Sequence, residues 1–227
     1  MPYRPRCGTA GLVFHVLNRA VRRARLFDHG ADYAAFLLVF RQAQARIPLR
    51  ILAYCIMPNH FHMVVWPTTD SELSAFMQWL TSTHSKRWHL HNQTRGTGSV
   101  YQGRFKSFPV QTDAHFLAVC RYVEQNPLRA GLVGRAEDWV WSSLWDRCKD
   151  YNRVRLEEWP ILRPPDWLES VNRVDSGAMT PIRRSVLRSR PYGEAAWTQQ
   201  TAKRLGLKSS LRSIGRPKTS GFVLQKP

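Results

Sequence analysis

The chain has few cysteines, and it lacks any long hydrophobic run. Its four cysteines, Cys7, Cys55, Cys120 and Cys148, are scattered without a Cys-x-x-Cys pair, which argues against a zinc knuckle and against a disulfide framework. No stretch of about 18 apolar residues could form a transmembrane helix, and the first residues lack the apolar region and cleavage site of a signal peptide. We therefore expect a cytoplasmic protein with free thiols and no membrane partner.

Acidic residues are also scarce relative to basic ones. The 227 residues include 16 Asp+Glu and 34 Lys+Arg, so the formal net charge is +18. Such an excess predicts a polyanionic partner, nucleic acid before an anionic membrane, and hence a location at the nucleoid. With 43% hydrophobic and 11% aromatic residues, the chain is expected to fold around one core with an appendage.

The positive charge is concentrated near the C-terminus. From residue 183 onward a single acid, Glu194, accompanies eleven basic residues, namely Arg183, Arg184, Arg188, Arg190, Lys203, Arg204, Lys208, Arg212, Arg216, Lys218 and Lys226. This segment is either an arm that binds a polyanion or a solvated end with no partner.

Hydrophobic periodicity predicts an α+β fold. The expected order is strand, helix, strand, strand, helix, strand, helix, within residues 11–21, 31–47, 51–57, 58–67, 70–92, 100–111 and 112–126. This order matches the split βαβ, ferredoxin-like arrangement, an antiparallel sheet with helices on one face. Residues 138–182 are expected to be irregular with short helices, and residues 193–207 to be helical. We therefore divide the chain into a core, residues 1–150, and a basic, partly helical C-terminal extension, residues 151–227.

Two histidines lie one residue apart in the second strand of a hairpin. Because strand side chains alternate between faces, His60 and His62 share one face in the stretch YCIMPNHFHMVVWP. Two imidazoles side by side can bind one metal ion. They can also be half-buried histidines whose nitrogens have protein partners.

The helix within residues 112–126 carries a tyrosine that the helical periodicity places away from its apolar stripe. The stripe predicted from 100° per residue consists of Phe116, Leu117, Cys120 and Val123. Tyr122 lies off this stripe, with Gln125 and Asn126 about one turn further along. The tyrosine and an amide could meet the histidine pair, or Tyr122 could simply place its hydroxyl in water.

Several motifs in order resemble the HUH single-tyrosine transposases, and the whole chain is similar to their REP-associated tyrosine transposase branch. The motifs are MPNHFHMVV, VYQGRFKSFPV, RYVEQNPLRAGLV and WVWSS, followed by the basic tail, and together they cover about residues 8 to 218. The resemblance implies that His60 and His62 hold a divalent metal, Mg²⁺ or Mn²⁺. It also implies that Tyr122 is the nucleophile and that Asn126, or else Gln125, is the third ligand.

The resemblance implies a metal-dependent endonuclease and strand transferase that acts on single-stranded DNA hairpins of interspersed repeats. Tyr122 would form a 5′-phosphotyrosine, and a metal with open positions would polarise the phosphate. Two alternatives stay open at this point. One is a transposase-derived regulator that binds hairpin DNA or RNA without cutting it, and the other is a phosphohydrolase in which Tyr122 is incidental. Neither a monomer nor a homodimer is excluded.

Basic and aromatic residues suggest where DNA would lie. A strand with alternating cations and rings suits a groove that follows the phosphate backbone and stacks bases. The expected DNA contacts are Arg19, Tyr101, Arg104, Phe105, Lys106, Arg121 and Arg129 in the core, and Arg183, Arg184, Lys203, Arg204 and Arg216 in the extension. Each arginine or lysine taken alone could equally be a solvated surface charge.

Overall fold

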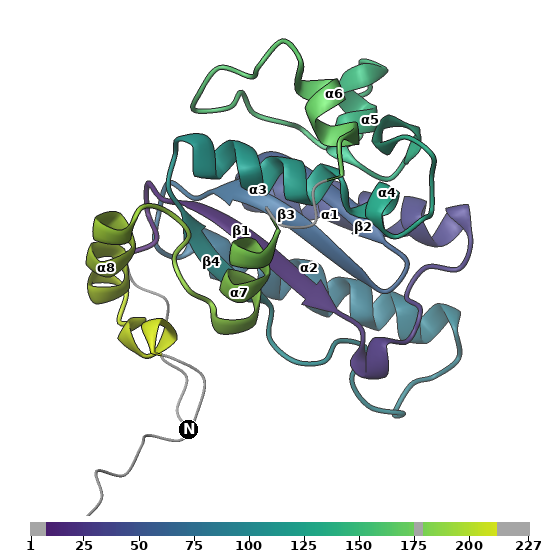
Figure 1. The fold of residues 1–227 in the computed structure, drawn as a ribbon. Helices are drawn as coiled ribbons and strands as arrows, with labels where there is room; N and C mark the ends of the chain where they lie inside the picture. Colours follow the sequence, from purple (N-terminus) through teal and green to yellow (C-terminus); the bar gives the residue numbers. More distant parts are fainter. Residues whose placement is uncertain (1–7, 175–178, 213–227) are drawn as a thin grey trace, which may run out of the picture.

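A four-stranded antiparallel sheet forms the centre of the molecule, in a computed structural model that describes residues 8–174 and 179–212 (Figure 1). The strands are β1 (Val13–Arg19), β2 (Arg50–Met57), β3 (His60–Trp66) and β4 (Lys106–Val110), in the spatial order β2-β3-β1-β4. Helix α1 (Gly30–Arg46) connects β1 to β2, and α2 (Glu72–His91) connects β3 to β4. The predicted split βαβ arrangement is therefore confirmed.

Helices α1 and α2 cover one face of the sheet. Their buried side chains pack against strand residues such as Phe14, Phe61 and Met63. Along α2 the buried positions follow a helical period of three and four residues, which gives the helix one continuous apolar side. This face contains the larger aromatic core and leaves the opposite face of the sheet for other elements.

The opposite face is also covered, which corrects the prediction that helices lie on one face. Helix α3 (Ala114–Glu124), followed by α4 (Asn126–Arg129), lies across the sheet (Figure 1), and its apolar side packs on residues such as Val64 and Phe108. The N-terminus of α3 is capped by Asp113, whose carboxylate accepts a hydrogen bond from the His115 amide at 2.8 Å. The two faces therefore bury separate hydrophobic clusters.

The C-terminal extension packs onto the core. It contains α6 (Trp167–Asn172), α7 (Thr180–Arg188), α8 (Ala195–Arg204) and a 3-10 turn at Lys208–Leu211, while α5 (Ser143–Cys148) and short 3-10 turns at Val21–Arg23 and Ala136–Asp138 precede it. Trp167, Val171 and Ile182 belong to the same buried cluster as Val64. The predicted helix within 193–207 is confirmed as α8. Helices α5 and α6 lie within residues 138–182, where short helices were expected, and α7 begins at the end of this stretch.

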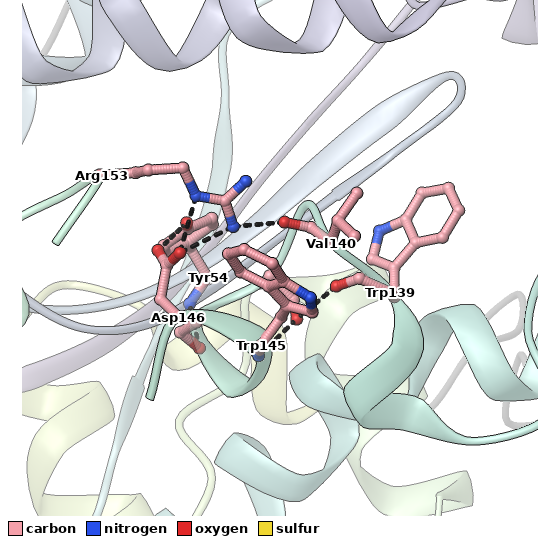
Figure 2. A network of polar contacts seen from close by, with 8 residues as sticks. Tyr54, Trp139, Val140, Trp145, Asp146 and Arg153 are labelled. Atoms are coloured by element: carbon pink, nitrogen blue, oxygen red, sulfur yellow. Dashed lines mark hydrogen bonds and ion pairs between the residues drawn. The ribbon is translucent and has the colours of Figure 1, made fainter. Parts of the chain in front are cut away.

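A polar network fastens the beginning of the extension to the sheet (Figure 2). The buried Asp146 carboxylate of α5 accepts a hydrogen bond from the Tyr54 hydroxyl of β2 and one from Arg153 Nε at 2.7 Å. Arg153 also donates to the Val140 carbonyl oxygen. Because a buried carboxylate requires such partners, the network fixes the chain on both sides of residue 150.

Cys55, Cys120 and Cys148 are free thiols, in agreement with the sequence. Among the residues that the structure describes, no helix is both long enough and apolar enough to cross a membrane.

Candidate active site

The strand register places the histidine pair on the sheet face beneath α3. His60 lies opposite Arg19, and His62 lies opposite Leu17, which in turn lies opposite Lys106 on β4. Directly opposed residues of antiparallel strands point to the same face. Arg19, Lys106 and the two histidines therefore share one face, as the alternation in β3 predicted for His60 and His62.

The two imidazoles lie next to each other, with ring centroids 4.8 Å apart. His60 Nδ1 is 2.6 Å from Asn59 Oδ1, and the Asn59 amide nitrogen donates to the Arg23 carbonyl oxygen at 3.2 Å. This second bond fixes the amide orientation, so Asn59 Oδ1 is an acceptor and His60 Nδ1 carries the proton. The Nε2 lone pair of His60 is left without a hydrogen-bond partner among the described residues.

Both histidines are held in the neutral form. Burial lowers the pKa of His60 to about 3, with Arg19 contributing in the same direction, and it lowers the pKa of His62 well below its usual value. A neutral imidazole is the form that binds a metal ion. Burial therefore prepares the pair for coordination at any pH near neutrality.

A third histidine, which the sequence did not single out, completes the cluster. His15 of β1 is 1% exposed, and its Nε2 lies 2.9 Å from His62 Nδ1. Its ring stacks on Phe108, with centroids 4.8 Å apart. The stretch VFHVLNR contains the relevant signal, a histidine on the inward side of an apolar strand, but only the strand order shows which strand it faces.

Tyr122 faces the sheet and is 7% exposed, which corrects the prediction that it points away from the core. Its ring lies perpendicular to that of His62, with centroids 5.6 Å apart. The reason is that α3 is covered on more than one side, by the sheet and by α5 and α6, so its apolar stripe does not identify the side that faces the sheet. Tyr122 therefore meets His62 of the histidine pair.

The environment of the Tyr122 hydroxyl combines burial with positive charge. Burial raises the pKa of Tyr122, and Arg129, Arg183 and Arg19 oppose this rise. The Arg129 guanidinium carbon lies 5.5 Å from the centre of the Tyr122 ring. Arg121, an expected DNA contact, lies against α6, with Nη1 3.5 Å from Ser170 Oγ.

Two buried arginine nitrogens on this side have no hydrogen-bond partner among the described residues. They are Arg19 Nε and Arg129 Nη1. Buried donors without partners are rare in folded proteins, and binding of an anion is one explanation for them. The arrangement suits a phosphate brought close to Tyr122.

Asn126 and Gln125 differ sharply in what they contact. The Gln125 amide nitrogen donates to the carbonyl oxygens of Val171 and Arg173, at 2.6 and 2.9 Å, so this fully buried side chain is bound to the α6 segment. The Asn126 amide nitrogen donates to the Tyr122 carbonyl oxygen at 2.8 Å. The side-chain oxygens of Asn126 and Gln125 both make no hydrogen bond with a described residue. The Gln125 amide is held against the α6 segment, so Asn126 is the better candidate ligand.

The donor set fits a divalent metal. Two neutral imidazoles and one amide oxygen can bind a divalent ion and leave positions open for phosphate oxygens, and the choice of Mg²⁺ or Mn²⁺ rests on the resemblance. In the described residues no three His, Cys, Asp or Glu side chains converge on one metal position.

A cavity of about 280 Å³ beside the histidines brings three of the expected DNA contacts together. Arg19, Arg104 and Lys106 line it, with Leu187 of α7 on its other side. Phe105 lines an adjoining cavity of about 520 Å³ on α2, which shares Arg104. A larger cavity of about 640 Å³ next to Trp159 is lined by none of the site residues.

Tyr101 is not part of such a surface. It is 4% exposed, its hydroxyl lies 2.8 Å from His84 Nδ1, and it packs in the core beneath α1 and α2. Strand β4 begins only at Lys106, so the alternation expected from residue 100 does not apply to Tyr101. The prediction of a stacking ring at this position is wrong.

The cations of the extension are placed differently from one another. Four of them are exposed, namely Arg183, Arg184, Lys203 and Arg204. Of these four, only Arg183 lowers the pKa of the Tyr122 hydroxyl. Arg204 also donates to the Ala10 carbonyl oxygen at 3.4 Å. Arg216 lies outside the described residues.

The comparison with protein families identifies the class of protein to which this chain belongs. The model of the family described as transposase, IS200 like, matches residues 9–126. This match covers more than half of the chain, so the chain belongs to the IS200-like transposase family.

Two relatives narrow the resemblance to one branch. The chain is 23% identical, over 174 residues, to a protein of Haemophilus influenzae named as a REP-associated tyrosine transposase, and the match covers 73% of this chain and 92% of the relative. A solved structure of a REP-associated tyrosine transposase bound to a REP hairpin has a TM-score of 0.52 and 19% identity. It covers 71% of this chain and 94% of the other, and it supports the fold.

Proposed function

We propose that this protein is a metal-dependent endonuclease and strand transferase that cuts and rejoins single-stranded DNA at hairpin-forming repeats. The observation that carries the proposal is the position of Tyr122, buried against His62, with the neutral His60 beside it and unpaired arginine donors nearby. Membership of the IS200-like transposase family supports the same reaction class.

The chemistry follows from the residue types. The Tyr122 oxygen attacks the scissile phosphorus, the bond from phosphorus to the 3′-oxygen breaks, and that oxygen leaves as a hydroxyl after taking a proton. The product is a 5′-phosphotyrosine. Because this ester retains the energy of the phosphodiester bond, a second 3′-hydroxyl can reverse the step and join strands without ATP.

The charged residues have separate tasks in this reaction. Arg129 and Arg183 favour the phenolate form of Tyr122, which the buried site otherwise disfavours. His60, His62 and Asn126 would hold Mg²⁺ or Mn²⁺, which when bound supplies Lewis-acid activation of the phosphate. Arg19 and Lys106, which line one cavity, would bind neighbouring phosphates.

The proposed substrate is a hairpin of an interspersed repeat, because the similar solved structure is bound to a REP hairpin. In this proposal residues 1–150 contain the catalytic residues and the basic extension contacts DNA. The net charge of +18 favours a protein that is associated with the nucleoid.

A single experiment separates cleavage from binding alone. Wild type and Tyr122→Phe are incubated with 3′-labelled hairpins from the DNA flanking the gene, with Mn²⁺ or with EDTA. We expect a covalent adduct only for wild type with metal, and equal hairpin affinity for both proteins. Binding without an adduct in wild type would favour the regulator, and cleavage by Tyr122→Phe would favour the phosphohydrolase.

A further inference from the structure

We infer that His15 is a positioning residue for the metal site, which orients His62 by accepting the hydrogen of its Nδ1. The inference rests on the proposed function, since it concerns how His62 would bind a metal. It starts from the 2.9 Å contact between His15 Nε2 and His62 Nδ1.

The strand register produces this contact. His15 lies opposite Val64, and His62 lies opposite Leu17, so His15 and His62 are diagonal neighbours on one face of adjacent strands. Diagonal pairs are within reach of ring side chains. The contact is therefore built into the pairing of β1 with β3.

The shared proton decides whether His62 can be a ligand. If His15 Nε2 carries the hydrogen, His62 Nδ1 accepts it, and a neutral His62 then has its own hydrogen on Nε2. That nitrogen has no lone pair for a metal. If His62 Nδ1 donates to His15 Nε2, the Nε2 lone pair of His62 is free.

The second arrangement makes the two ligands equivalent. His60 already donates its Nδ1 hydrogen to Asn59 and has a free Nε2. With His15 as acceptor, His62 presents the same nitrogen. An outer partner that fixes the tautomer and orientation of a ligating histidine commonly contributes 10- to 100-fold in metal affinity.

The surroundings hold the His15 ring in place. It stacks on Phe108 with an interplanar angle of 28°, and it lies at 70° to the Tyr122 ring with centroids 6.0 Å apart. His15 is 1% exposed, so water does not replace it as the acceptor. Removing its nitrogen while keeping a ring should therefore affect His62 without opening the site.

The test compares two variants of the full-length protein. His15→Phe keeps the ring and its stacking on Phe108 but has no acceptor, whereas His15→Gln places an amide oxygen near the position of Nε2. Binding of Mn²⁺ in the absence of DNA is measured from the electron paramagnetic resonance signal of the free ion. Adduct formation and thermal unfolding without metal are measured on the same samples.

We expect His15→Phe to weaken Mn²⁺ binding 10- to 100-fold and His15→Gln to restore most of the loss, with adduct formation changing in parallel. Unchanged Mn²⁺ affinity in His15→Phe would overturn the inference, as would an equal loss in both variants. A His60→Ala protein distinguishes a failure of the proposed metal site from a failure of the role of His15. If it binds Mn²⁺ like wild type, the metal site and the role of His15 both fail. If His60→Ala loses Mn²⁺ binding and His15→Phe keeps it, only the role of His15 fails.

Discussion

Replacing Arg129 by glutamine tests whether positive charge above the Tyr122 ring favours its ionisation. At the observed 5.5 Å from guanidinium to ring centre, the attraction to a phenolate is about 3 kcal/mol for an effective dielectric constant of about 20. Arg129 is half-buried, and screening by water reduces this to about 1.5 kcal/mol. We therefore expect an about tenfold lower fraction of phenolate, and an about tenfold slower cleavage, below the pKa of Tyr122.

The assay is single-turnover formation of the covalent adduct with a 3′-labelled hairpin, at saturating DNA and at several pH values. The deficit of Arg129→Gln should narrow as the pH rises, because the phenol then ionises in both proteins. Arg46→Gln is the matched control, since Arg46 is exposed at the end of α1 on the other face of the sheet. A deficit that is the same at every pH, or that Arg46→Gln shares, would refute the electrostatic role.

Three further predictions concern stability and DNA binding. Burial lowers the pKa of His84 to about 4, so the neutral form stabilises the fold above pH 6.5 and this stabilisation is lost as the pH falls toward 4. The reference is His84→Asn, which keeps an acceptor for the Tyr101 hydroxyl. Relative to it, the free energy of unfolding of wild type in urea should fall by on the order of 3 kcal/mol between pH 6.5 and pH 4. A difference that stays constant over this range would contradict the assignment. Tyr54→Phe should cost about 1–3 kcal/mol of unfolding free energy, because the buried Asp146 carboxylate loses one of its donors, and an unchanged urea midpoint would count against it. Deleting residues 213–227 removes three cations and should flatten the plot of log hairpin affinity against log salt by about two units if all three contact phosphates, whereas an unchanged slope would mean that they do not.

The structure also sets the limits of a truncation experiment. Trp167, Val171 and Ile182 are buried in the core, so a protein ending at residue 150 would lose part of the packing around α3. The division into a catalytic part and an extension therefore stays a prediction about function, and it does not describe two separately packed bodies.

Features of the fold that depend on neighbours in sequence were predictable. The hairpin that contains the histidines, the shared face of His60 and His62, and the order of strands and helices all follow from alternation and helical periodicity. Features that depend on which elements pack together were not. The partnership of His15 with His62 needs the pairing of β1 with β3, which no local pattern in the sequence encodes.

Helix α3 shows the same limit at the site itself. Its buried side chains contact both the sheet and the helices that cover it, so the sequence shows a helix that is apolar over much of its surface. A helix of this kind has no single inward side that periodicity can identify. The position of Tyr122 over His62 was therefore reached by resemblance, and its burial was not foreseen.

The packing of the extension on α3 has a consequence for protein synthesis. Tyr122 and the histidines leave the ribosome well before Val171, which packs with α3, and before Arg183, which acts on the Tyr122 hydroxyl. When Tyr122 has emerged from the ribosome, the nascent chain still lacks Val171 and Arg183, which complete the surroundings of the tyrosine. The proposed active site is therefore complete only once α7 has emerged, and shorter nascent chains lack part of it.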